Sequence, residues 1–210
     1  MTLLSDGLLR TLDVVALASP LVLFLRHAER RDIAPTDPYA DVDLTERGRE
    51  QASELARMLP YRPVWAAVSP FLRCKKTAHL LQMEQLEIDQ RLGRPGPWVV
   101  DEKAGARLFA ELGTEGVVRA QIAGSRWPFV RSPREGTKLL LTVASERLAA
   151  GRGSGVCVSH DAVLMPVIAA LTEDRFPASW LAPLDGFALH YTDDKLRCTW
   201  RGRTHEVPIW

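Results

Sequence analysis

The stretch Leu21-Val-Leu-Phe-Leu-Arg-His-Ala-Glu29 decides the fold of this chain. Its first five residues form an uninterrupted apolar run, of the length and composition that suit a strand buried on both faces. Polar residues follow at once, beginning with Arg26 and His27. The pattern predicts a central strand whose carboxyl end carries side chains capable of chemistry.

Two further apolar runs, Val64 to Val68 and Gly155 to Val158, have the same character. Helix patterns lie between the runs. Thr45 to Leu59 has apolar residues at helical spacing, can be capped by its threonine, and stops before a proline. Strands that alternate with helices predict an α/β fold, a three-layer α/β/α sandwich around a mainly parallel sheet.

Two more helices can be expected from their end signals. One should start at Ser69-Pro70, with the serine as cap and the proline at the first helical position. The other spans Thr137 to Ala150 and ends at Gly151. Toward the C-terminus, Gly186 to Tyr191 and Leu196 to Trp200 flank a polar turn and predict a hairpin.

The length of 210 residues is enough for one domain with its own core, so we expect a single domain over residues 1–210. Glycine and proline gather at 93–97 and at 124–133, on either side of a helical pattern over Glu102 to Ala123 that is broken at Gly113 and Gly116. This composition predicts an inserted cap segment around residues 89–135.

The charges are nearly balanced, with 27 Lys and Arg against 26 Asp and Glu, a formal net charge of +1. No overall field therefore attracts nucleic acid or an anionic membrane, and we expect neither as a partner. Charged residues interrupt the apolar part of the first twenty residues, which favours an N-terminal amphipathic helix over an export signal. The three cysteines, Cys74, Cys157 and Cys198, are widely separated, which is typical of a reducing compartment and predicts a cytoplasmic protein.

Each apolar run ends in a polar cluster. The clusters are Arg26-His27 with Glu29 and Arg30, then Ser69-Pro70 with Arg73, then Ser159-His160-Asp161. In an open parallel sheet, ligands bind beyond the carboxyl ends of the strands, so clusters far apart in sequence can meet in one pocket. Several arginines in one pocket indicate a phosphorylated ligand, because the guanidinium group is always charged and matches phosphoryl oxygens.

The chain resembles the histidine phosphatase superfamily, whose fold is that of the phosphoglycerate mutases, in four motifs. These are Arg26-His27-Ala28-Glu29 after a strand, Leu44-Thr45 with Gly48 and Gln51-Ala52, Ser69-Pro70 with Arg73 and Thr77-Ala78, and His160 after a strand. The resemblance covers residues 21–82 and 155–171. It implies that His27 is the nucleophile, that Arg26, Arg73 and His160 bind the phosphoryl group, and that no metal or organic cofactor is needed.

The proton donor is less clearly indicated. Acid-phosphatase-like members have an Asp directly after the second histidine, as Asp161 stands here, and an arginine three residues after the nucleophile, as Arg30 does; the proline they carry two residues later is Asp32 in this chain. Mutase-like members use an acid from a later segment, for which Asp101 and Glu102 lie at a suitable distance, although residues 93–98 do not look like their motif.

We therefore expect Asp161 to be the proton donor and Arg30 to be an additional phosphate ligand, with Asp101 and Glu102 as the other candidate acids. Two plainer interpretations remain open: Asp161 as a helix cap and Arg30 as part of a solvated loop.

The expected function is a phosphatase that hydrolyses a phosphate monoester through a phosphohistidine intermediate on His27. The expected substrate is a phosphorylated small molecule. The alternatives are a protein phosphohistidine phosphatase, a phosphoglycerate-type mutase, and a catalytically silent protein that binds a phosphorylated ligand. The sequence does not indicate an oligomeric state.

Overall fold

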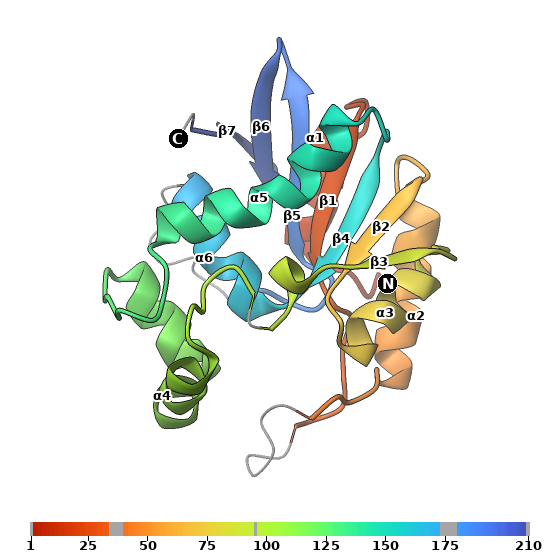
Figure 1. Cartoon of the computed structure of the whole chain (residues 1–210). Coiled ribbons are helices and arrows are strands. Elements are labelled where there is room, and N and C mark those ends of the chain that lie inside the picture. Colours follow the sequence, from red (N-terminus) through yellow and green to blue (C-terminus); the bar gives the residue numbers. More distant parts are fainter. Residues whose placement is uncertain (1, 34–39, 95, 173–179, 209–210) are drawn as a thin grey trace.

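The computed structural model describes residues 2–33, 40–94, 96–172 and 180–208. Its centre is a seven-stranded sheet in the order β3-β2-β4-β1-β5-β6-β7 (Figure 1). The strands are β1 (Leu21–Arg26), β2 (Trp65–Val68), β3 (Leu86–Ile88), β4 (Gly155–Ser159), β5 (Gly186–Thr192), β6 (Lys195–Trp200) and β7 (Arg203–Glu206).

The core of the sheet is parallel. Strands β3, β2, β4 and β1 pair in parallel, whereas β5, β6 and β7 extend the sheet in antiparallel fashion beyond β1. Arg26 is in register with Ser159, and Val68 with Val158. The carboxyl ends of the three apolar runs therefore meet at one edge of the sheet, as the sequence predicts.

Helices cover both faces of the sheet and complete the predicted α/β/α sandwich (Figure 1). The helices are α1 (Asp6–Val15), α2 (Glu46–Met58), α3 (Leu72–Leu80), α4 (Glu102–Ile122), α5 (Pro133–Ala149) and α6 (Asp161–Thr172), with a 3₁₀ turn at Gln90–Leu92. One hydrophobic cluster joins the sheet to α1, α2 and α3, and the other joins it to α5, α6 and part of α4.

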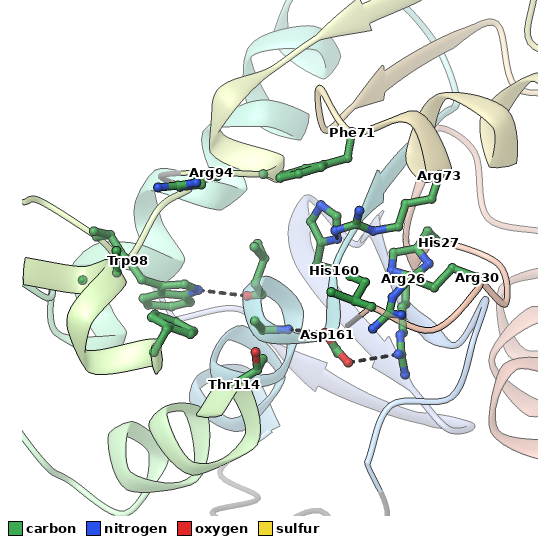
Figure 2. A pocket seen from close by; sticks show the side chains of 18 of the residues that line it. Arg26, His27, Arg30, Phe71, Arg73, Arg94, Trp98, Thr114, His160 and Asp161 are labelled. Carbon is green, nitrogen blue, oxygen red and sulfur yellow. Dashed lines mark hydrogen bonds and ion pairs between the residues drawn. The ribbon is translucent and has the colours of Figure 1, made fainter. Parts of the chain in front are cut away.

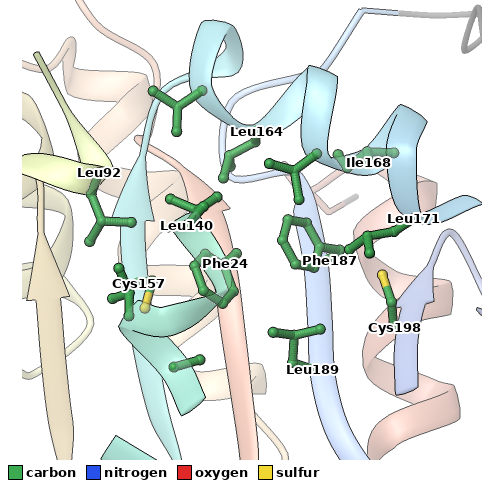
Figure 3. Packing of buried hydrophobic residues seen from close by; sticks show 14 of the residues in the cluster. Phe24, Leu92, Leu140, Cys157, Leu164, Ile168, Leu171, Phe187, Leu189 and Cys198 are labelled. Carbon is green, nitrogen blue, oxygen red and sulfur yellow. The ribbon is translucent and has the colours of Figure 1, made fainter. Parts of the chain in front are cut away.

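The strand β1 lies between the two clusters. Leu21, Leu23 and Leu25 belong to one cluster, and Val22 and Phe24 to the other, and all five side chains are fully buried. The ring of Phe24 stacks on that of Phe187, with ring centres 4.9 Å apart (Figure 3). Burial of one such side chain stabilises the fold by about 1.5–3 kcal/mol. Each of the five positions in this strand therefore requires an apolar residue.

The helix ends differ from the expected ones at two places. Thr45 caps α2 as predicted, its hydroxyl accepting a hydrogen bond from the Gly48 amide. The prediction that Ser69 caps the next helix is wrong, because α3 begins at Leu72 and the Ser69 hydroxyl is bonded to His160 instead. The helix α5 begins four residues before the predicted start, where Ser132 and Glu135 form a capping box.

The segment 89–135 contains the 3₁₀ turn and α4, which packs against α6. The predicted break in α4 occurs at Gly113, whose φ of 68° departs from the helix, whereas Gly116 continues the helix. Whether this segment is an inserted cap stays a prediction. Position 95 of the segment lies outside the described residues.

The C-terminal hairpin forms as expected. Strands β5 and β6 pair across a two-residue turn in which Asp193 and Asp194 have φ values of 50° and 59°, the conformation that a tight hairpin turn demands. The strand β7 was not predicted. Among the described residues, no helix is both long and apolar enough to cross a membrane.

Candidate active site

The polar clusters meet in a pocket of about 370 Å³ at the carboxyl ends of the parallel strands (Figure 2). All six residues singled out from the sequence line it: Arg26, His27, Arg30, Arg73, His160 and Asp161. They come from the end of β1 and the loop after it, from the first turn of α3 and from the junction of β4 with α6.

The imidazole of His27 is held in one orientation. Its backbone amide donates to the carbonyl of Ser159 at 2.9 Å, and its ring Nδ1 donates to the carbonyl of Ala28 at 2.8 Å. This tautomer leaves Nε2 as the basic nitrogen. Burial lowers the pKa of His27 to about 3, and the positive charges of Arg26 and Arg73 act in the same direction. At neutral pH the ring is therefore uncharged and its Nε2 lone pair is available.

The second histidine, His160, packs edge to face against His27, with ring centres 5.3 Å apart. Its Nε2 lies 2.8 Å from the hydroxyl of Ser69, and its Nδ1 lies 3.5 Å from a guanidinium nitrogen of Arg73. Since a guanidinium group only donates, Nδ1 is the acceptor and Nε2–H donates to Ser69. Burial and the neighbouring His27 and arginines keep the pKa of His160 well below 6.5.

Two arginines have buried N–H groups with no hydrogen-bond partner among the described residues, although Nη1 of Arg73 forms an ion pair with Asp41 at 3.9 Å. These groups are Nε of Arg26 and both Nε and Nη1 of Arg73. The Arg73 guanidinium also lies 4.4 Å from the centre of the Phe71 ring, which fixes its plane. A buried donor left without an acceptor costs about 1–3 kcal/mol, so the arrangement favours an anion with several acceptor oxygens.

Arg30 is half-buried at the edge of the same pocket. Its Nη1 donates to the carbonyl of Arg31 at 2.7 Å. Burial and the nearby charge of Arg26 lower its pKa. Arg30 thus lines the pocket, and its role as a phosphate ligand stays a prediction.

The loop that carries His27 and Arg30 rests on the beginning of α2. The amide of Thr45 donates to the carbonyl of Glu29 at 3.0 Å, and the Thr45 hydroxyl donates to the Glu29 carboxylate at 2.7 Å. A β-carbon on Gly48 would lie 2.0 Å from the same carbonyl oxygen. The residues Thr45 and Gly48 therefore act by positioning the loop.

Asp161 is the first residue of α6 and is ion-paired with Arg26 at 3.1 Å. Its carboxylate accepts hydrogen bonds from Ala162 N and from Trp180 Nε1, each at 2.9 Å. Burial alone would raise the pKa of Asp161, but Arg26 and these hydrogen bonds outweigh it and lower the pKa. The group is ionised in the free site.

The other two candidate acids differ in position. Asp101 caps α4 by accepting hydrogen bonds from Lys103 N and Ala104 N, and it does not line the pocket. Glu102 does line the pocket.

Several residues of the site were not foreseen in these positions. Trp98 lines the pocket and also belongs to a hydrophobic cluster. Ser69 was interpreted as a helix cap, and no sequence signal links Trp180 to Asp161, because that contact depends on how the chain returns after α6. Phe71 and Phe109 line the pocket beside the charged residues.

The sequence of residues 22–93 matches the model of the histidine phosphatase superfamily (branch 1). The match ends before His160 and Asp161, so it does not bear on the acid-phosphatase-like features at the second histidine. No curated protein matches the chain in sequence.

Solved structures resemble nearly the whole chain. YhfR of Bacillus stearothermophilus has a TM-score of 0.62 at 15% identity, over 87% of this chain and 96% of its own. A mycobacterial glucosyl-3-phosphoglycerate phosphatase has a TM-score of 0.55 at 18% identity, over 81% and 90%. A variant of phosphoserine phosphatase from Entamoeba histolytica, in complex with phosphoserine, has a TM-score of 0.58 at 16% identity, over 86% and 96%.

At these identities the likeness shows the fold, which is phosphoglycerate-mutase-like. Residues 22–93 are therefore similar in sequence to the histidine phosphatase superfamily, and the chain as a whole shares the phosphoglycerate-mutase-like fold of these structures.

Proposed function

We propose that the chain is a phosphatase that hydrolyses a small phosphate monoester in two steps through a phosphohistidine on His27. The observation that carries the proposal is the pairing of a neutral, fixed imidazole with buried guanidinium N–H groups that make no hydrogen bond to the described residues. Phosphatases among the structural relatives agree with this reading of the site.

In the first step, Nε2 of His27 attacks phosphorus in line with the ester bond. The N–P bond forms as the P–O bond breaks, and the electron pair leaves with the alcohol oxygen. Arg26, Arg30 and Arg73 bind the non-bridging oxygens, where negative charge is concentrated. In the second step, water attacks phosphorus as the N–P bond breaks, a proton of the water passes to the carboxylate that served as the acid, and inorganic phosphate departs. The electron pair of the N–P bond returns to Nε2, which leaves His27 neutral.

Asp161 is proposed as the acid that protonates the leaving oxygen. Because its pKa is lowered in the free site, it must take up a proton when the substrate binds. A bound phosphate places negative charge next to the carboxylate and raises its affinity for a proton. A substrate that binds as its monoanion supplies that proton directly.

The volume of the pocket supports a small substrate. At about 370 Å³ it lies toward the lower end of the roughly 300–1,000 Å³ typical of small-molecule sites. The site needs no metal or organic cofactor in this mechanism, because the arginines supply the positive charge.

A second candidate is a phosphoramidate substrate, such as phosphohistidine on a protein. The low pKa of Asp161 favours it, since cleavage of an N–P bond demands less from a general acid. This candidate predicts that Asp161→Asn leaves phosphohistidine hydrolysis almost unchanged while it impairs ester hydrolysis.

Hydrolysis of p-nitrophenyl phosphate with chelator present, from about pH 4 to 9, tests the proposal. We expect turnover by the wild type, none by His27→Ala, and wild-type turnover by His205→Ala, whose ring lies on β7 outside the pocket. Rapid quenching should trap an alkali-stable, acid-labile phosphoryl group on the wild type alone. Turnover that survives in His27→Ala would rule the mechanism out.

Wild-type protein that binds phosphate but turns over no ester would support the silent binding role. Return of the phosphoryl group to a second hydroxyl of the product would support the mutase.

A further inference from the structure

Beyond its charged end, the pocket is walled by apolar side chains. Ile33, Phe71, Val99, Phe109 and Val163 all line it. Figure 2 shows Arg73, His27 and Arg30 gathered on one side, with Trp98 and Thr114 on the opposite side. A bound phosphoryl group would therefore direct the remainder of the substrate toward Trp98.

This part of the pocket is preformed. The indole of Trp98 is 5% exposed, donates from Nε1 to the carbonyl of Val163 at 3.1 Å, and packs so tightly on Gly136 that a β-carbon there would lie 2.1 Å from the ring. Val99 and Phe109 are only partly buried, so they have apolar surface left to lose to a ligand. Removal of such surface from water favours binding.

The polar groups in this part are few. Apart from the residues at the charged end, only Arg94, Glu102 and Thr114 contribute polar side chains to the lining described by the structure. Arg94 and Glu102 carry opposite charges and are both exposed, so this part of the pocket offers a carboxylate on the leaving group no net attraction. A sugar would need more hydrogen-bonding partners than these side chains offer. An uncharged apolar group needs no ionic partner and no hydrogen-bonding partner.

We infer that the leaving group of the substrate is an uncharged, apolar group of about the size of one aromatic ring, which contacts Val99 and Phe109. The inference rests on the proposed function and specifies its substrate class. Phe109 and Val99 are then specificity residues, which act by burying the leaving group and take no part in the chemistry.

Esters whose alcohols are of similar chemical reactivity separate a preference for an apolar leaving group from intrinsic reactivity. We compare 2-phenylethyl phosphate with glycerol 1-phosphate and O-phosphoserine, all of which have alkyl leaving groups. The expected kcat/KM for the phenylethyl ester is higher by about tenfold or more. Equal values for the three esters, or a preference for phosphoserine, would overturn the inference and leave the phosphatase function standing.

The variant Phe109→Ala should remove most of this preference, while kcat/KM for glycerol 1-phosphate changes little. Phe129→Ala is the matched control, because Phe129 is partly buried in the same 89–135 segment but does not line the pocket. Thermal unfolding of both variants checks that each folds. If Phe109→Ala keeps the full preference, Phe109 is not a specificity residue and the inference fails.

If no ester is hydrolysed, a binding measurement separates the proposed phosphatase function from the apolar subsite. 2-Phenylethylphosphonate and methylphosphonate carry the same anionic group and differ in the apolar part. Calorimetry should show about tenfold tighter binding of the phenylethyl compound to the wild type. Tighter binding of the phenylethyl compound without turnover of any ester would overturn the phosphatase function and support the apolar subsite. Equal binding of the two phosphonates without turnover would overturn both proposals.

Discussion

Burial decides the protonation of the two histidines in the pocket. His27 and His160 lie among arginines and away from water, and both effects disfavour a charged ring. A protonated His27 would have no lone pair on Nε2 and could not attack phosphorus. The same burial that makes the ring hard to reach thus keeps it in its reactive form.

We therefore predict that neither ring titrates near its usual pH in the folded protein. NMR signals of the His27 and His160 side chains should stay constant from about pH 8 to 5, whereas in the urea-unfolded chain they should shift with a midpoint near 6.5. A midpoint near 6 for His27 in the folded protein would contradict the assignment of its pKa.

The general acid can be identified by how strongly the loss of kcat in a variant depends on the leaving group of the ester. Asp161→Asn should lower kcat for an alkyl phosphate by about 10²–10⁴-fold, because the alkoxide needs a proton. It should lower kcat for p-nitrophenyl phosphate much less, since nitrophenolate leaves without one.

Glu102→Gln serves as the comparison, because Glu102 also lines the pocket. If Glu102→Gln shows the strong dependence on the leaving group and Asp161→Asn does not, the acid is Glu102. A loss that is equal for both esters in Asp161→Asn would mean that Asp161 acts only by holding Arg26, to which it is ion-paired.

Residues that directly follow an apolar run were open to prediction, because the strand fixes where they emerge. His27 follows β1 and His160 follows β4, and the parallel pairing brings both to one edge. The contact of Ser69 with His160 was not predictable, since it depends on the exact register of β2 and β4. The contact of Trp180 with Asp161 was not predictable either, because the two residues are 19 positions apart and no sequence signal links them.

At the scale of the elements, one tight contact near the site is that between the start of α2 and the loop after β1. Gly48 lies on α2 directly beneath the carbonyl of Glu29, where no side chain fits. This contact explains why a glycine follows Thr45 by three residues in a motif that has no chemistry of its own.

Gly48→Ala should therefore push the loop out of place. We expect a loss of about 1–3 kcal/mol in the free energy of unfolding and a fall in kcat/KM, because Glu29 lies two residues from His27. Urea unfolding and steady-state kinetics measure the two effects.

Gly116→Ala is the control on α4, where the nearest atom to a new β-carbon is 3.4 Å away. It should keep the activity and raise the stability by up to about 1 kcal/mol. A Gly48→Ala protein as stable and active as the wild type would show that the loop tolerates displacement.

The central strands were predictable from sequence because burial on both faces requires an unbroken apolar run. The strands β3 and β7 lie at the edges of the sheet, and they were missed because they are short and only partly buried. The start of α5 was missed because Ser132 and Pro133 lie in a stretch rich in glycine and proline, which obscured a valid capping signal.

At the scale of the whole molecule, the buried histidines link stability to pH. Their pKa values are lower in the folded protein than the 6.5 of the unfolded chain. Between pH 6.5 and the folded pKa, the unfolded chain binds more protons, so stability rises with pH in this window and is complete above it.

Urea unfolding should therefore show a loss of about 2 kcal/mol from His27 when the pH falls from 7.5 to 5.0, and a further loss in the same direction from His160. The variant His27→Asn should lose about 2 kcal/mol less than the wild type over the same interval. An identical loss in the two proteins would mean that His27 is accessible to protons in the folded state.

The position of β1 in the sheet has a consequence during synthesis on the ribosome. This strand is made early, yet its two neighbours, β4 and β5, are made only after residue 150. Until then its apolar residues have no partner strand, and an unpaired apolar strand promotes aggregation. Nascent chains that stall near residue 150 should need a chaperone to stay in solution, and the complete chain released from the same cell-free translation should not.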